Sequence, residues 1–263
     1  MNYMLGTRRL WVFNFDGTLS PFVPDRREAW LHEECGRMLR FLTSSPWNRV
    51  AVISSRSLAD VAARISCPGV AIGGGSGLEW ELPGGHRLGP DSETENLLAA
   101  NRRLVSTLLA EVAAIPGVDV EDKGWSVAVH FRNAAPKSFR RRTRLLQQLR
   151  NRAGIRMYRG YEAVEVQFVR GGSKSAGLCR LCRLLGREAY RDGIVYAGDD
   201  ENDATALRWV HSRGGMGIVV GNRIMVPSAL SVEEPEGLPR AVYALSGAAP
   251  ERKPPAVRQA ASG

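Results

Sequence analysis

The chain has 263 residues, of which 44% are hydrophobic and 24% are charged, a balance typical of an ordinary globular protein. This composition excludes a disordered, collagen-like or coiled-coil protein, and no apolar run approaches the roughly 20 residues needed to span a bilayer. No signal-peptide cleavage site precedes Asn14 and Asp16, so we expect a cytoplasmic protein with no membrane partner.

The positive charge of the chain comes almost entirely from arginine. The net charge is +9, and lysine occurs only at four positions. The densest basic run, residues 140–144, shares a predicted helix with Leu145, Leu146 and Leu149, which is typical of a solvated helix face beside a core stripe. No zinc-finger or RNA-binding signature accompanies it, so we expect no nucleic-acid partner. The same charge would attract a small anionic substrate.

The first part of the chain alternates short apolar strands with helices. The run 10–14 ends in polar residues and Gly17, as expected of a buried strand that delivers side chains to its carboxyl end. The elements predicted next are a helix over 26–43, a strand over 50–53, a helix over 58–65, a strand over 70–72 and a glycine-rich turn over 73–77. This order is typical of a parallel sheet with right-handed crossovers.

The pattern then changes to paired strands with helices between them. After a hairpin over 81–90, the sequence predicts a helix over 93–113, strands over 118–121 and 126–132, a helix over 136–152, and strands over 155–158 and 163–168. The first rhythm resumes with a helix over 173–185, a strand over 194–197, a helix over 203–210 and a strand over 217–220.

These patterns indicate an α/β protein with a Rossmann-like parallel-sheet core and an inserted α+β cap. We assign residues 1–92 and 172–246 to the core and residues 93–171 to the cap. The segment 247–263, rich in Pro, Ala and charge, is predicted to be a flexible tail. We expect the chain to be a monomer.

Polar residues follow the core strands where each strand ends. The carboxyl ends of parallel strands meet at one edge of a sheet, which is where open α/β sheets place their active sites. Carboxylates there suit Mg²⁺, while a hydroxyl and an ammonium can orient phosphate oxygens. The residues concerned are Asn14, Asp16, Ser54, Lys174, Asp199, Asp200 and Asp203. Together they predict a phosphoryl-transfer site.

The order of these motifs resembles the four-motif signature of the haloacid dehalogenase superfamily. Its elements here are NFDGT at 14–18, Ser54 at a strand end, Lys174, and GDDEND at 198–203. Within that superfamily the chain is most similar to the trehalose-6-phosphate phosphatases, through the core segments 52–56 and 75–79, the cap segment 117–132 and VEVQF at 164–168.

The resemblance implies a mechanism and a set of site residues. The first motif position attacks phosphorus to form an aspartyl phosphate, and Asp16 protonates the leaving sugar oxygen and later activates water. The implied Mg²⁺ site comprises Asn14, the Asp16 backbone carbonyl and Asp199, with Asp203 and Asp200 in the supporting shell. The implied substrate contacts are Arg56, Gly75, Ser76, Glu121, Lys123, His130 and Glu165.

One departure from the family concerns the nucleophile, because Asn14 stands where the family has aspartate. An uncharged carboxamide is a poor nucleophile, so we expect a chain that binds substrate but is inactive or nearly so. Three explanations are open: an introduced change that traps a substrate complex, a natural non-catalytic sugar-phosphate-binding protein, or recruitment to another reaction. The first is favoured, because every other motif residue is intact.

Smaller departures concern the substrate. Ser76 replaces a histidine of the family, and the last motif differs from the usual form of the trehalose enzymes. These changes point to a related sugar phosphate, such as a disaccharide, pseudodisaccharide or aminocyclitol phosphate, which Glu121, Lys123 and His130 could hold.

Overall fold

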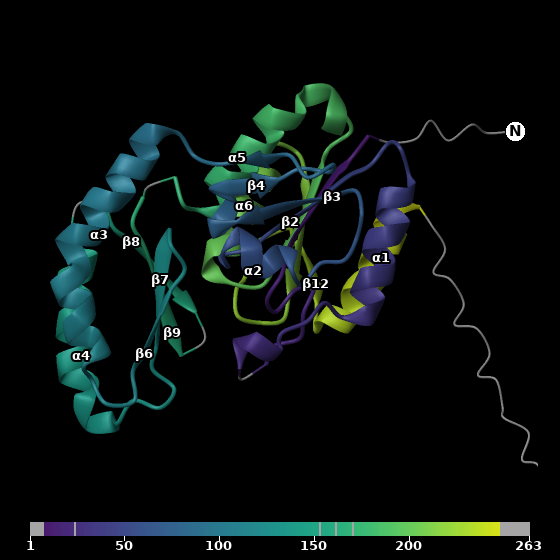
Figure 1. Cartoon of the computed structure of the whole chain (residues 1–263). Coiled ribbons are helices and arrows are strands. Elements are labelled where there is room, and N and C mark those ends of the chain that lie inside the picture. Colours follow the sequence, from purple (N-terminus) through teal and green to yellow (C-terminus); the bar gives the residue numbers. More distant parts are fainter. Residues whose placement is uncertain (1–7, 24, 153, 161, 170, 248–263) are drawn as a thin grey trace, which may run out of the picture.

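The computed structural model describes residues 8–23, 25–152, 154–160, 162–169 and 171–247. It contains an eight-stranded sheet with the order β12-β11-β10-β1-β2-β3-β4-β5 and a four-stranded sheet with the order β6-β7-β9-β8. Figure 1 shows the two sheets in separate parts of the molecule, with the smaller one between helices α3 and α4 and the core. We call the unit formed by α3, α4 and the smaller sheet the cap.

The core sheet is parallel from β12 to β3, and β4 and β5 add an antiparallel edge. Its strands are β1 (Leu10–Asn14), β2 (Arg49–Ile53), β3 (Val70–Gly74), β4 (Glu79–Glu81), β5 (Arg87–Leu88), β10 (Ile194–Gly198), β11 (Met216–Val220) and β12 (Leu230–Val232). The core helices are α1 (Glu33–Ser44), α2 (Leu58–Ala62), α5 (Lys174–Leu185), α6 (Glu201–His211) and α7 (Leu238–Ser246).

The cap is an antiparallel sheet backed by two helices. It contains α3 (Ser92–Ala113), β6 (Asp119–Asp122), β7 (Ser126–His130), α4 (Phe139–Arg150), β8 (Arg156–Gly160) and β9 (Ala163–Gln167). Short 3-10 turns over Arg26–Glu28, Gly75–Gly77, Pro136–Ser138, Arg187–Tyr190 and Pro235–Gly237 complete the described elements.

The central strand β1 is buried on both faces, which explains its continuous apolar run. Trp11 and Phe13 pack among the residues of α1, α2 and α7, whereas Leu10 and Val12 pack among those of α5 and α6. Alternate side chains of the strand therefore pack against the helices on opposite faces of the sheet. The strand's carboxyl end, at Asn14, is consequently fixed in the middle of the molecule.

Alternation also orients the cap sheet. Val127 and Val129 of β7 and Val166 of β9 pack against the inner faces of α3 and α4. The residues between them face the other way, so that Glu121, Ala128, Glu165 and Tyr158 form one row across the sheet by strand register. That row faces the core.

The expected fold class, a parallel α/β core with an inserted α+β unit, is confirmed. The domain boundaries at 92/93 and 171/172 stay predictions, and residues 248–263 of the predicted tail lie outside the described residues. In the described part of the chain, no helix has both the length and the apolar character needed to cross a membrane.

The expected single helix over 26–43 is wrong. A 3-10 turn capped by Asp25 ends at Glu28, Ala29 is extended, and α1 begins only at Glu33. The His32 N–H donates to the Leu19 carbonyl oxygen at 2.9 Å, which attaches this segment to the loop after β1 instead of continuing a helix. The sequence did not predict β12, the edge strand beside β11, or α7, which packs beside α1.

Candidate active site

The first motif forms a tight polar cluster at the carboxyl end of β1. The Asn14 side-chain amide donates to the Asp16 backbone carbonyl and to Asp199 Oδ1, each at 2.7 Å. Thr18 Oγ1 donates to the same Asp199 oxygen at 3.0 Å. Asn14 and Asp199 are only 3% and 4% exposed. The ends of β1 and β10 therefore deliver their polar residues to one point, as the sequence predicts.

Gly17 allows this close approach. Its φ is +75°, and a Cβ built there would overlap the Asp199 carboxylate. The glycine turn therefore lets the chain after β1 curl tightly against the end of β10.

A buried ion-pair cluster lies beside the first group. Lys174 Nζ donates to Asp203 Oδ1 at 2.7 Å and lies 3.7 Å from Asp200 Oδ1, and the Tyr196 hydroxyl donates to Asp203 Oδ1 at 2.6 Å. The other Asp203 oxygen accepts the backbone N–H groups of Asp199 and Asp200 at 3.0 and 3.2 Å. Because protein donors use both of its oxygens, Asp203 serves to fix Lys174 and the loop after β10.

Burial strongly affects the ionisation of this cluster. Burial, together with the neighbouring carboxylates, raises the pKa of Asp199 to about 8 and that of Asp203 to about 6. Burial alone would lower the pKa of Lys174, but the Asp200 and Asp203 carboxylates raise it instead. Arg223, 3.1 Å from Asp199 Oδ2, adds positive charge at the rim.

The residues around Asn14 can be tested for their fit to Mg²⁺. Among the described residues, no group of three or more His, Cys, Asp or Glu side chains is arranged to hold a metal ion. The oxygen donors that converge are the Asp199 carboxylate, the Asp16 backbone carbonyl and, after a half-turn of its amide, the Asn14 side chain. Mg²⁺ commonly uses few protein oxygens and keeps several waters, so this set fits it. A cation there would also favour the ionised form of Asp199.

Arg56 holds Asp16 in a bidentate ion pair. Its Nη2 and Nε donate to the two Asp16 carboxylate oxygens at 2.6 and 2.8 Å. The Arg56 side chain is itself fixed by Asp60 Oδ2 at 2.6 Å and by the Arg26 carbonyl oxygen at 2.7 Å. Asp16, which is partly exposed, is therefore oriented by a buried and rigidly held guanidinium.

The cap contributes a second polar cluster. Lys123 Nζ lies 2.8 Å from Glu165 Oε2, and His130 Nε2 lies 3.3 Å from Glu121 Oε2. Glu121 also pairs with Arg26, which comes from the core. Burial opposes the change, but the His130 hydrogen bond and the charges of Lys123 and Arg26 lower the pKa of Glu121. Glu121 is therefore an anion at neutral pH.

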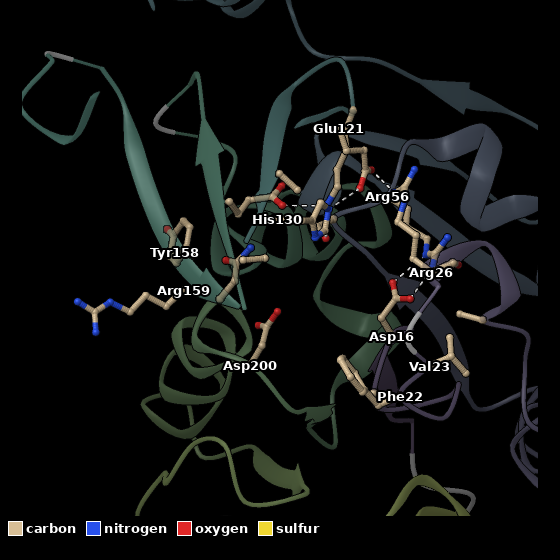
Figure 2. A pocket seen from close by; sticks show the side chains of 18 of the residues that line it. Asp16, Phe22, Val23, Arg26, Arg56, Glu121, His130, Tyr158, Arg159 and Asp200 are labelled. Carbon is tan, nitrogen blue, oxygen red and sulfur yellow. Dashed lines mark hydrogen bonds and ion pairs between the residues drawn. The ribbon is translucent and has the colours of Figure 1, made fainter. Parts of the chain in front are cut away.

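One cavity lies between the Asp16–Arg56 ion pair of the core and the polar cluster of the cap; Asn14, Lys174, Asp199 and Asp203 are buried and do not line it. Asp16, Arg56 and Asn202 line it from the core, and all four predicted cap residues line it from the other side: Glu121, Lys123, His130 and Glu165. Figure 2 shows Glu121 and His130 on the cap side of this cavity and Asp16 and Arg26 on the core side. A ligand held here would touch both domains.

Several predicted residues lie beneath this cavity and do not line it. Ser54 is fully buried, and its hydroxyl accepts the Arg56 backbone N–H at 3.1 Å. Ser76 accepts a hydrogen bond from the Asn202 side chain at 3.2 Å, and Gly75 packs against Trp125 of the cap. These residues support the loops that carry the lining.

Four lining residues were not predicted from the sequence: Arg26, Tyr158, Arg159 and Asn202. Asn202 had a signal, since it lies inside the motif GDDEND and its Oδ1 accepts the Lys174 N–H at 3.1 Å. The others depend on where the cap rests against the core, which has no local signature.

A Rossmann-like core with this polar cluster and a cap over the cleft defines a capped phosphoryl-transfer fold of the haloacid dehalogenase type. Within it, the chain belongs to the trehalose-phosphatase family, whose family model matches residues 12–231. The expected family resemblance is thus confirmed.

The curated relatives agree. The trehalose-phosphate phosphatase of Mycobacterium tuberculosis is 30% identical over 203 residues, which cover 77% of this chain and 51% of the relative. An uncharacterized glycosyl hydrolase of the same species is 34% identical over 223 residues, covering 82% of this chain and 16% of the relative. The chain thus spans about half the length of the curated trehalose-phosphate phosphatases it matches.

Solved structures share the fold at lower identity. The C-terminal domain of Candida albicans trehalose-6-phosphate phosphatase has a TM-score of 0.72 and 20% identity, covering 92% of this chain and 93% of that one. The sucrose-phosphatase of Synechocystis, solved with sucrose and phosphate, has a TM-score of 0.60 and 14% identity, covering 92% and 98%.

Proposed function

We propose that this chain binds a sugar phosphate, trehalose 6-phosphate or a related disaccharide or pseudodisaccharide phosphate, in a phosphatase site whose nucleophile position holds Asn14. The observation that carries the proposal is the single cavity lined by Asp16 and Arg56 on one side and by Glu121, Lys123 and His130 on the other. Family membership supports phosphate-ester chemistry at the core side.

Each side of the cavity suits one end of such a ligand. On the core side, the Arg56 guanidinium lines the cavity and suits phosphate oxygens, whereas Lys174 and Ser54, which the family resemblance assigns to the phosphate, lie beneath it. Glu121 and Glu165 accept hydrogen bonds from sugar hydroxyls, whereas Lys123 donates to them. Asp16, oriented by Arg56, would protonate the leaving sugar oxygen and then take a proton from water.

Asn14 blocks the step that precedes these proton transfers. In the family's reaction, a carboxylate oxygen bonds to phosphorus as the sugar oxygen departs and takes its proton from the acid. The amide nitrogen of Asn14 donates to Asp16 and Asp199, and its lone pair is delocalised, so no anion faces the phosphorus. We infer that the chain binds the ester without hydrolysing it at a useful rate.

Mg²⁺ is part of this proposal. The Asn14 side chain, the Asp16 carbonyl and Asp199 would hold it, and it would supply positive charge beside the phosphate oxygens. A cytoplasmic location and a monomeric state also stay predictions.

A second candidate is a non-catalytic sugar-phosphate-binding protein in which Asn14 is natural. Asn14 itself is the observation that favours it. The fold is compatible with such a role, since the C-terminal domain of a Candida albicans trehalose synthase regulatory protein shares it with a TM-score of 0.70 and 15% identity.

Calorimetric titration tests the proposed ligand class. Trehalose 6-phosphate, sucrose 6-phosphate, glucose 6-phosphate and unphosphorylated trehalose are each titrated with and without Mg²⁺. We expect a disaccharide phosphate to bind at least about 100-fold more tightly than trehalose, because charge-assisted hydrogen bonds to phosphate are strong.

A pair of lysine variants controls for charge. Lys123→Met should weaken this binding, and Lys137→Met, which removes an exposed cap lysine, should not. Equal affinity for trehalose and its phosphate, or no binding by any phosphate, would overturn the proposal.

A further inference from the structure

A second and larger cavity opens between the cap and the core beside the first. It has a volume of about 860 Å³ and is bounded by α4, by the edge strand β8 and by Glu201 at the start of α6. We call it the α4 groove. The residues of α4 that line it, from Phe139 through Arg142, Leu146 and Arg150, recur every three or four positions. One continuous face of the helix therefore forms the wall.

The groove is positively charged. Arg142, Arg150 and Arg159 line it, and Glu201 is its single acidic residue. One Glu201 carboxylate oxygen already accepts the backbone N–H of Arg159 at 2.7 Å. Within the described residues, none of the three guanidinium groups forms an ion pair with a carboxylate, so their donors are available to an anion.

Aromatic rings fix one of these guanidinium groups. Arg142 lies 4.7 Å from the ring centroid of Phe131 and 5.3 Å from that of Phe139. Stacking of this kind orients the planar guanidinium before a ligand arrives, which lowers the entropic cost of binding. Phe139 is still 59% exposed, so much of its ring remains open.

The remaining lining residues suit a saccharide. The exposed ring of Phe139 can cover the apolar face of a sugar, and the side-chain amides of Gln147 and Asn151 can both donate to and accept from hydroxyls. Charge, ring and amides together match a sugar that carries a phosphate or carboxylate group.

The groove is separate from the proposed phosphate site. Tyr158 and Arg159 of β8 line both cavities and form the wall between them. Figure 2 shows the Arg159 side chain extending away from Asp16 and His130, so its guanidinium is directed away from the first cavity. We propose that the α4 groove is a second binding site, which takes a separate molecule of a small anionic saccharide.

Calorimetry on the full chain, with trehalose 6-phosphate as the probe, tests the proposed second site. The second-site proposal rests on the proposed function only in the choice of this probe. The groove variant combines Arg142→Gln with Arg150→Gln. The matched control combines Arg140→Gln with Arg144→Gln, which removes the same charge from exposed positions of the same helix that do not line the groove.

We expect two equivalents to bind to the unaltered chain and to the control. The groove variant should bind one, its second event being weakened at least about tenfold by the loss of two charge-assisted contacts. Two equivalents in the groove variant, or one in all three proteins, would overturn the proposal.

A fourth protein, which carries Lys123→Met alone, distinguishes failure of the second-site proposal from failure of the proposed function. That variant should lose the event at the first cavity and keep the one at the groove. A single event that depends on Lys123 alone leaves the proposed function standing without the second site. A single event that depends on Arg142 and Arg150 alone supports the groove and contradicts the first cavity, and no binding at all contradicts both.

Discussion

Replacing Lys174 by methionine tests the ionic cluster on which the candidate site is built. The Lys174 ammonium is 1% exposed, lies 2.7 Å from the fully buried Asp203 and lies 3.7 Å from Asp200. Methionine has a similar volume and leaves these carboxylates without their cation. Breaking a buried pair by removing one partner typically costs about 3–5 kcal/mol. For a chain of this size that corresponds to a melting temperature lower by roughly 6–20 °C.

The loss should depend on pH. Asp203, whose pKa burial raises to about 6, takes up a proton more readily in the folded chain than in the unfolded chain. A carboxyl group with a raised pKa favours folding below its unfolded pKa, and this contribution disappears as the pH rises through the folded pKa. Without Lys174 the folded pKa rises further, so the destabilisation should be largest near pH 8 and smaller near pH 5.5.

Urea denaturation followed by circular dichroism measures both effects, with Lys137→Met as the exposed control. Adding Asp203→Asn to Lys174→Met should recover part of the loss, because the unpaired charge is then removed. A loss below about 1 kcal/mol, or an equal loss at both pH values, would refute the reasoning.

Three further predictions concern the cap and the thiols. Glu121→Gln should weaken binding of trehalose 6-phosphate about tenfold in calorimetry, because an anionic acceptor held by Arg26 and His130 is lost. Glu162→Gln, at a residue that does not line the cavity, should leave the affinity unchanged, and equal effects of the two variants would count against the role assigned to Glu121. Gly75→Ala places a Cβ 2.8 Å from the Trp125 ring, so it should weaken sugar-phosphate binding. Gly85→Ala, at a glycine that also has a positive φ but no neighbour within 4 Å, should weaken it less. Equal binding by the two variants would show that the contact with Trp125 is unimportant. Burial raises the pKa of Cys35 to about 12 and that of Cys182 to about 11. At pH 8.5, iodoacetamide should therefore label the half-buried Cys179 first, as measured by mass spectrometry. Equally fast labelling of Cys35 would contradict its burial.

Local patterns were sufficient to predict the centre of the molecule. The unbroken apolar run of β1, followed by Asn14, Asp16 and Gly17, predicted both a buried strand and a polar strand end. The same reasoning located Asp199 after β10, because hydrophobic strands that end in polar residues depend only on neighbours in the chain. The expectation that Lys174 also follows a core strand is wrong, since it is the first residue of α5 and the strand before it, β9, belongs to the cap.

Contacts between distant segments were not predictable in this way. The start of α1 depends on the hydrogen bond from His32 to Leu19, and the cavity role of Arg26 depends on its pairing with Glu121 across the cleft. The strand β12 has only three residues, Leu230–Val232, which is too short for a periodic signal.

The most direct test of the central claim compares phosphate release from trehalose 6-phosphate by this chain and by its Asn14→Asp variant, with Mg²⁺ present. Restoring the carboxylate should produce turnover that the unaltered chain lacks, and adding Asp16→Asn to that variant should remove it again, since Asp16 is the proposed acid and base. If the Asn14→Asp variant releases no phosphate while the unaltered chain still binds trehalose 6-phosphate, the phosphatase account is contradicted and the non-catalytic binding protein takes its place.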